Sequence, residues 1–175
     1  GLAVADHVGR RVLDRAAAQG RRVDIGSVGV VELDINQQHV IAGDVEDFAE
    51  WSGIPTINAL TDAEHPCQIL TDIFTYQELR GPIAGKVVTY IGDGACNVPI
   101  SWIWAAAKLN FQLRIAAPKA YQPSPDLIAK AGGNITVTED PNAAAEGADI
   151  LYTDVWVSMG METEAAQREQ DFANY

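Results

Sequence analysis

The fold of this chain is decided by one stretch, Lys86-Val87-Val88-Thr89-Tyr90-Ile91-Gly92-Asp93-Gly94. Its first six residues are mostly apolar and β-branched, which predicts a buried strand over Lys86–Ile91. The glycines then turn the chain, and a helix is predicted after them, up to about Leu109. A buried strand that runs through a glycine turn into a helix is the repeating unit of α/β proteins.

The same alternation continues toward the C-terminus. Short helices are predicted to end at Ala131 and to start at Asp140-Pro141, and they separate further strands at Leu113–Ala117, Ile135–Thr138 and Ile150–Thr153. These spacings suit right-handed crossovers, so we predict an α/β fold with an open parallel sheet and flanking helices, Rossmann-like, from about residue 86. Ligands of such sheets bind where the strands end. Three segments follow those ends: Gly92–Asn97, Ala117–Tyr121 and Asp154–Gly160.

The first part of the chain predicts a second, smaller lobe. We place residues 1–64 in this N-terminal lobe and residues 65–175 in the lobe that contains the sheet, which begins with a helix over residues 66–79; a boundary within that helix is the alternative. The elements expected in the N-terminal lobe are a helix over residues 3–19, one or two strands within Val23–Asp34, a short strand at His39–Ala42, a helix over residues 44–52 capped by Asp44, and an extended piece at Ile54–Asn58.

Charge and composition limit the possible functions. The chain has 175 residues and a formal net charge of -12, so nucleic-acid binding, which needs clustered Lys and Arg, is not expected. Two cysteines, Cys67 and Cys96, give no disulfide framework and favour a reducing, cytoplasmic compartment. The sequence has no apolar run long enough to span a membrane, and its start lacks the apolar core of a signal peptide, so no membrane partner is expected.

The run His65-Pro66-Cys67-Gln68 is the first motif with chemical potential. Pro66 marks the start of a helix, and His65 and Gln68 stand three residues apart on one side of its first turn. An imidazole, an amide and free backbone N–H groups together can hold a polarised carbonyl next to an anion. The alternative is a helix cap with a structural histidine.

The second motif, Gly92–Asn97, follows a strand and opens a helix. A dinucleotide fingerprint would have a third glycine where Asn97 stands, and the acidic ribose-binding residue is missing, since Ala116–Lys119 occupies its place. NAD binding by a Rossmann-like domain is therefore disfavoured. Asn97 is either a helix cap or a side chain that offers its amide to a ligand.

The third motif, Asp154–Gly160, reads Asp-Val-Trp-Val-Ser-Met-Gly and follows the last predicted strand. A carboxylate at the end of a strand, such as that of Asp154, can pair with an ammonium group, and Gly160 allows the loop to close over a ligand. The alternative is a loop cap beside a core tryptophan. We favour the ligand site, because packing alone gives no reason for this sequence.

In this order, the three motifs resemble the aspartate/ornithine carbamoyltransferase family, and within it the ornithine carbamoyltransferases. The resemblance covers roughly residues 44–165. The Asp-x-Trp-x-Ser-Met-Gly element separates the ornithine enzymes from their aspartate-using relatives, which share the His-Pro-x-Gln element. Three further stretches carry the resemblance: Asn58–Asp62, Ala116–Lys119 and Gly147–Asp149.

The resemblance implies carbamoyl transfer from carbamoyl phosphate to the δ-amine of ornithine, which gives citrulline and phosphate in arginine biosynthesis. It implies a carbamoyl-phosphate lobe, here shortened, at residues 1–64, an ornithine lobe at residues 65–175, no metal or organic cofactor, and a homotrimer or higher homo-oligomer. His65 and Gln68 would be catalytic and hold the carbamoyl group. The α-amino and carboxylate end of ornithine would contact Asn97, Asp154, Ser158 and Met159.

The sequence also departs from the family pattern. The Ser-Thr-Arg-Thr phosphate-binding turn, an Arg before residue 44 and the His-Cys-Leu-Pro element are not found, and Cys96 stands where the family commonly has a second Asn. Arg10 or Arg11 is a candidate phosphate ligand. Two alternatives to the enzyme follow: an incomplete fragment of it, or a relative that binds amino acids without turnover.

Overall fold

The computed structural model describes residues 29–31, 42–53, 55–157 and 162–175. They belong to two units, residues 1–68 and residues 69–175, and the division falls inside helix α3, Pro66–Arg80. The helix predicted over residues 3–19 and the candidate phosphate ligands Arg10 and Arg11 lie outside the described residues.

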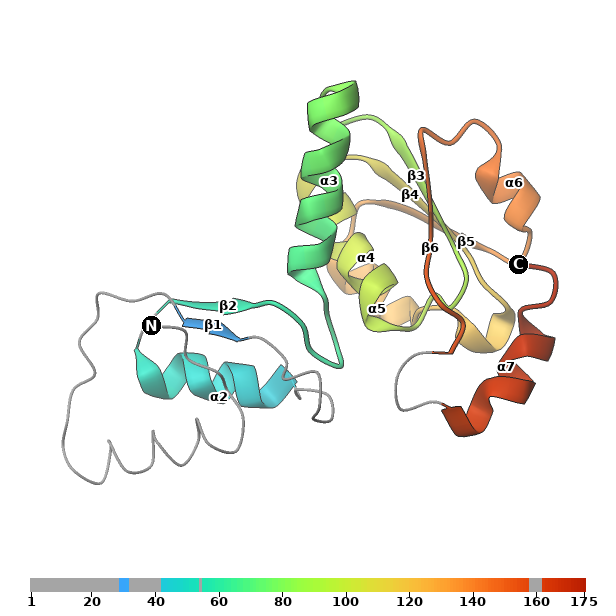
Figure 1. The fold of residues 1–175 in the computed structure, drawn as a ribbon. Coiled ribbons are helices and arrows are strands. Elements are labelled where there is room, and N and C mark those ends of the chain that lie inside the picture. Colours follow the sequence, from blue (N-terminus) through green and yellow to red (C-terminus); the bar gives the residue numbers. More distant parts are fainter. Residues whose placement is uncertain (1–28, 32–41, 54, 158–161) are drawn as a thin grey trace. The chain divides into compact units, whose positions relative to one another are not determined.

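Two short parallel strands, one helix and the first turn of α3 are the regular elements in the described part of the first unit (Figure 1). Strand β1, Gly29–Val31, pairs with β2, Thr56–Asn58, and helix α2 spans Ala42–Ser52. The predicted helix is confirmed, but the prediction of Asp44 as its cap is wrong. The helix begins two residues earlier, at a residue predicted to end a strand, and its first N–H, that of Ala42, donates to Asp62 Oδ1 at 2.8 Å.

The second unit contains a four-stranded parallel sheet in the order β5-β4-β3-β6, which confirms the predicted α/β fold. Each predicted strand is present, within one residue of its expected bounds. The register pairs Val88 with Leu113 on one side and with Ile150 on the other. The strands are β3 at Val87–Ile91, β4 at Gln112–Ala116, β5 at Asn134–Thr138 and β6 at Ile150–Thr153.

Helices cover both faces of this sheet (Figure 1). The predicted ones are present: α3, then α4 at Asn97–Leu109, α5 at Pro125–Ala131 and α6 at Pro141–Ala145. The structure adds elements that were not predicted. These are helix α7 at Ala165–Asp171 and 3-10 turns at Lys119–Tyr121 and Glu162–Glu164.

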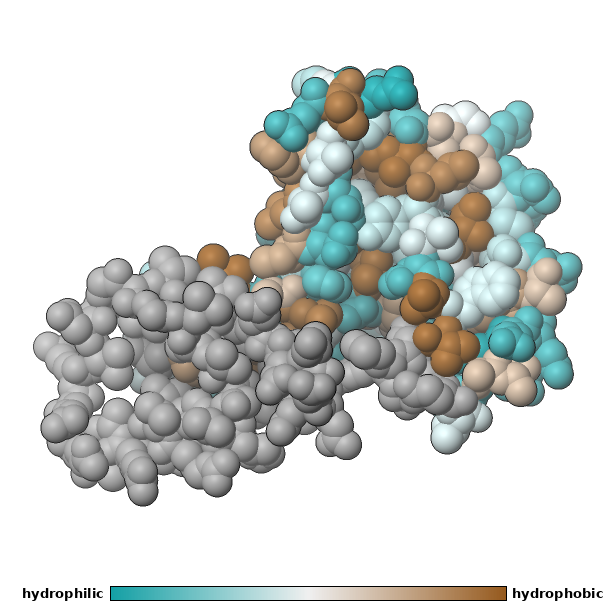
Figure 2. Space-filling view, in the orientation of Figure 1, coloured by the Kyte–Doolittle hydropathy of each residue, from teal (hydrophilic) through white to brown (hydrophobic). Residues whose placement is uncertain are grey.

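Successive side chains of β3 and β4 point to opposite faces of the sheet. Tyr90 of β3 joins the main core with the fully buried Trp102 of α4, whose ring packs edge-on against Phe111. On the opposite face, the Thr89 hydroxyl donates to the Ala144 carbonyl of α6 at 2.7 Å. Large apolar side chains also remain on the surface of this unit (Figure 2), among them Leu70 and Phe74 of α3 and Leu151 of β6. Because β3 is central and covered on both faces, its carboxyl end is a fixed platform for the loop that follows.

Candidate functional site

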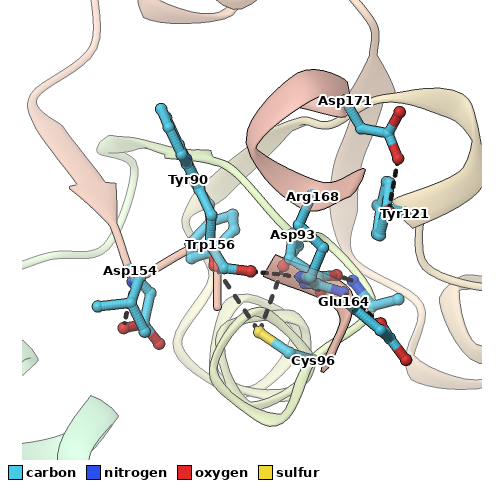
Figure 3. Close-up of polar contacts among 11 residues, drawn as sticks. Tyr90, Asp93, Cys96, Tyr121, Asp154, Trp156, Glu164, Arg168 and Asp171 are labelled. Carbon is cyan, nitrogen blue, oxygen red and sulfur yellow. Dashed lines mark hydrogen bonds and ion pairs between the residues drawn. The ribbon is translucent and has the colours of Figure 1, made fainter. Parts of the chain in front are cut away.

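The carboxyl ends of β3 and β6 lie next to each other, because Ile91 pairs with Thr153 in the parallel register. Two of the three motifs begin at these ends: the Gly92–Asn97 loop after β3 and the segment from Asp154 after β6 (Figure 3). The Gly92 N–H donates to the Ala116 carbonyl of β4 at 3.0 Å. The sheet therefore brings together two segments that lie about 60 residues apart in the sequence.

Glycine is required at position 94 by close packing. A Cβ atom there would lie 2.9 Å from Ile115 Cγ2 and 3.0 Å from the Tyr121 carbonyl oxygen. Gly92 has a φ of 138°, which L side chains rarely adopt. The two glycines thus let the loop lie flat against the end of the sheet.

Asn97 is the first residue of α4, and the helix cap is Cys96. The cap reading of Asn97 is therefore wrong: Cys96 is the residue with extended backbone, and its carbonyl already accepts the Ile100 N–H at 3.3 Å. The Asn97 carbonyl in turn accepts the Ser101 hydroxyl at 2.8 Å. Asn97 thus lies in the first helical turn, at the carboxyl edge of the sheet.

Cys96 of this loop, which is partly buried, and the fully buried Tyr90 of β3 form a polar pair (Figure 3). The Cys96 thiol donates to the Asp93 carbonyl at 3.3 Å, and its sulfur lies 3.8 Å from the Tyr90 hydroxyl. Burial, and then the Asp93 carboxylate, raises the pKa of Cys96 to about 11. Burial likewise raises the pKa of Tyr90, and Asp154 adds a smaller contribution to both shifts. At neutral pH both groups are protonated, so neither is an activated nucleophile.

Asp154 is half-buried just beyond the end of β6. Its Oδ1 accepts the N–H of the next residue, Val155, at 2.7 Å. Since Thr153 pairs with Ile91, Asp154 follows β6 at the same edge of the sheet as the loop after β3. The structure therefore brings Asp154 and the loop that ends in Asn97 to one edge of the sheet, whereas Ser158 and Met159 lie outside the described residues.

A buried ion pair, which the sequence did not predict, joins this edge to helix α7. The Arg168 guanidinium donates to Asp93 Oδ2, and only 5% and 8% of the two side chains are exposed. The Arg168 Nε–H donates to the Trp156 carbonyl (Figure 3). Burial by itself would lower the pKa of Arg168, but the Asp93 carboxylate outweighs burial and raises it. One sequence feature does distinguish Arg168: it is the single basic residue between Glu162 and Tyr175, among four acids.

His65 and Gln68 lie at the start of α3, where the sequence placed them, and both are half-buried. Pro66 is the first helical residue, as predicted. A tight turn precedes it, in which the Thr61 N–H donates to the Glu64 carbonyl at 2.8 Å. The two side chains belong to the first unit, and Asn97 and Asp154 to the second. Their assignment to the carbamoyl group stays a prediction.

The residues that the structure describes give no further candidate of the metal-binding or membrane-spanning kind. Among these residues, no group of three His, Cys, Asp or Glu side chains is placed to hold a metal ion. Of the helices that the structure describes, none combines the length and the apolar character needed to cross a bilayer. The carboxyl edge of the sheet in the second unit and the start of α3 in the first are two separate candidates for functional residues.

Family models match the two parts of the chain separately. Residues 84–175 match the Asp/Orn binding domain of aspartate/ornithine carbamoyltransferase, and residues 30–78 match its carbamoyl-P binding domain. The chain belongs to the aspartate/ornithine carbamoyltransferase family. The resemblance found in the motifs is thereby confirmed.

Relatives and solved structures agree with this membership. The ornithine carbamoyltransferase of Burkholderia mallei is 45% identical over 168 residues, which are 95% of this chain and 51% of that protein. The anabolic ornithine carbamoyltransferase of Campylobacter jejuni superposes with a TM-score of 0.76 at 32% identity, over 94% of this chain and 54% of that one. The ornithine carbamoyltransferase of Pyrococcus furiosus superposes with a TM-score of 0.73 at 37% identity, over 92% of this chain and 50% of that one. The chain spans about half the length of the curated relatives it matches.

Proposed function

We propose that the protein transfers the carbamoyl group of carbamoyl phosphate to the δ-amine of ornithine, giving citrulline and phosphate. One observation carries the proposal: the sheet brings Asp154 and the Gly92–Asn97 loop to one edge, within the segment that matches the Asp/Orn binding domain. The names of the relatives, all ornithine carbamoyltransferases, support ornithine as the acceptor.

The edge of the sheet supplies the groups that an amino acid needs. In this proposal the Asp154 carboxylate pairs with the α-ammonium group of ornithine, and the Asn97 amide, at the start of α4, contacts the same end of the molecule. Ser158 and Met159 complete the contacts. Holding the α-carbon end in this way leaves the δ-amine free to reach the second substrate.

His65 and Gln68 act on the other substrate. They donate hydrogen bonds to the carbamoyl oxygen of carbamoyl phosphate, where negative charge grows as the tetrahedral intermediate forms. The neutral δ-amine attacks the carbonyl carbon and forms the C–N bond. The C–O bond to phosphate then breaks, the nitrogen loses a proton, and phosphate leaves as the second product.

The same proposal includes the setting of the enzyme. We assign carbamoyl phosphate to the lobe of residues 1–64 and ornithine to the lobe of residues 65–175, with no metal or organic cofactor in the reaction. The assembly is a homotrimer or higher homo-oligomer that serves arginine biosynthesis in the cytoplasm. Two free cysteines, Cys67 and Cys96, are compatible with a reducing compartment.

An assay of citrulline formation tests the proposal on the full-length protein. Carbamoyl phosphate is mixed with ornithine, and in parallel with aspartate or with lysine, which has one more methylene. We expect citrulline with ornithine and much slower reaction with the others. Asp154→Asn, which keeps the shape but removes the charge, should raise the KM for ornithine. Ornithine binding by calorimetry without citrulline would instead identify a non-catalytic amino-acid-binding relative.

A further inference from the structure

Arg168 is bonded to both loops that begin at the carboxyl edge of the sheet. Through Asp93 it holds the loop after β3, and through the Trp156 carbonyl it holds the segment after β6. Asp93 lies four positions before Asn97, and Trp156 lies two positions after Asp154. One buried guanidinium therefore fixes the distance between the two segments that carry the amino-acid contacts.

We propose that Arg168 is a positioning residue for the amino-acid substrate: it sets the spacing between Asn97 and Asp154 without touching the substrate. The inference rests on the proposed function. It assigns to helix α7 a role that neither the motifs nor the family comparison gives it.

The side chain of Arg168 is held in place by aromatic rings as well as by its hydrogen bonds. Its guanidinium lies over two aromatic rings, with its carbon 4.9 Å from the centre of Tyr121 and 5.6 Å from that of Phe172. The Tyr121 hydroxyl donates to Asp171 Oδ2 at 2.8 Å, which ties the same helix to the loop after β4. The rings confine the guanidinium, and its hydrogen bonds to Asp93 and to the Trp156 carbonyl use two different N–H groups of the planar fork.

The carboxylate of Asp93 links Arg168 to the backbone of the loop after β3. Its Oδ1 accepts the Ala95 N–H at 3.0 Å while its Oδ2 accepts Arg168. The remaining charged contact of Arg168, with Glu164 at 3.7 Å, involves a side chain that is 61% exposed, so water competes with it. The directional bonds of the guanidinium therefore run to the two motif segments.

Arg168→Lys separates the two bonds. Lysine keeps a positive charge for Asp93, but it has no planar fork to reach the Trp156 carbonyl as well. We expect the KM for ornithine to rise by about tenfold or more, since a small misplacement of a binding group costs about that much. The KM for carbamoyl phosphate should stay within about twofold, because its contacts lie in the other lobe.

Arg114→Lys is the matched control in the same unit. Arg114 also donates two hydrogen bonds to backbone carbonyls, those of Ala144 at 3.1 Å and Glu146 at 2.6 Å, but on the face of the sheet covered by α6. This variant should lose stability without a selective change in either KM. Inhibition by norvaline, which is ornithine without its δ-amine, should weaken in Arg168→Lys in parallel with the KM for ornithine.

The outcomes are distinguishable. KM does not depend on the folded fraction, so partial unfolding of Arg168→Lys lowers the apparent kcat but leaves the ratio of the two KM values readable. If the unaltered protein makes no citrulline, the proposed function fails. If it makes citrulline, and Arg168→Lys leaves the KM for ornithine unchanged or alters both KM values equally, the positioning role is overturned.

Discussion

The loop after β3 and the turn before α3 both carry motif residues, yet they are held in different ways. The first is fastened by Asp93 and Arg168, a buried pair 75 residues apart in the sequence. The second is fastened by contacts within the turn itself: the Thr61 hydroxyl donates to the Glu64 carbonyl at 3.2 Å and accepts the Glu64 N–H at 3.1 Å.

This difference indicates how rigid each of the two segments is. A buried charge pair is expensive to leave half-formed, so the loop after β3 moves only if α7 moves with it. A turn closed by local hydrogen bonds costs little to open, about 1 kcal/mol for each bond. The loop after β3 is therefore expected to be the stiffer of the two segments, and the turn before α3 the more adjustable.

Breaking the buried pair should have the largest effect. Asp93→Ala leaves the Arg168 charge buried without its partner, and we expect a loss of about 3–5 kcal/mol in the free energy of unfolding of the second unit. Urea denaturation measures this by tryptophan fluorescence in a Trp51→Phe background, since the remaining tryptophans, Trp102, Trp104 and Trp156, all belong to that unit.

The exposed pair in the same unit is the control. Lys86 Nζ lies 3.4 Å from Asp149 Oδ1, with 38% and 34% of the side chains exposed. Lys86→Ala should cost less than about 1 kcal/mol. Equal losses in the two variants would contradict the view that the buried pair is what fastens the loop.

Two glycine substitutions sharpen the comparison, because they should change stability in opposite directions. Gly94→Ala forces a Cβ against the Tyr121 carbonyl and Ile115, so the second unit should lose about 1–3 kcal/mol. Gly43→Ala, in α2 of the first unit, meets nothing within 4 Å. It should stabilise that helix by about 0.5–1 kcal/mol, because alanine has less freedom to lose on folding. Urea denaturation reports the first change, and hydrogen exchange of the α2 amides the second.

Asp62→Ala tests the hydrogen bonds that Asp62 makes in the first unit, one to the start of α2 and one within its own turn. Asp62 Oδ1 accepts two backbone N–H groups, from Ala42 at 2.8 Å and from Ala63 at 2.9 Å, so its loss should cost α2 about 1 kcal/mol. Hydrogen exchange of residues 42–52 should speed up, while the amides of the second unit stay unchanged. Asp62→Asn, which keeps an acceptor oxygen, should restore protection, and faster exchange in both variants would assign the effect to charge instead.

The same contrast explains what the sequence predicted. The strand β6 was predicted with its observed bounds, and β3 to within one residue, because both are short apolar runs; in β3 the run reports burial, whereas β6 lies at the edge of the sheet and is partly exposed. The start of α3 was also predicted, since Pro66 marks a first helical residue by itself. Local chemistry of this kind is visible in a few neighbouring residues.

What the sequence did not predict depends on distant partners. Asp93 was visible as part of a glycine turn, but nothing near it identified Arg168 as its partner. Asp44 was predicted to cap α2, and the real acceptor, Asp62, comes from beyond β2. Helix α7 was missed because its residues are mostly polar: it is held by Arg168 and by Phe172, just past its end, rather than by an apolar stripe.

The smallest effect is expected from Cys96, and only in alkali. Its pKa is raised to about 11, so the folded protein holds the thiol proton at pH values where the unfolded chain has released it. The contribution of Cys96 to the free energy of unfolding is therefore fully present at neutral pH and decreases as the pH rises from 9.0 to about 11. In a Cys67→Ala background, the rate of alkylation by iodoacetamide should be low at pH 8 and should still be rising near pH 10. A rate that has levelled off by about pH 10 would show an ordinary, exposed thiol, and would mean that the loop after β3 opens far more readily than its buried ion pair predicts.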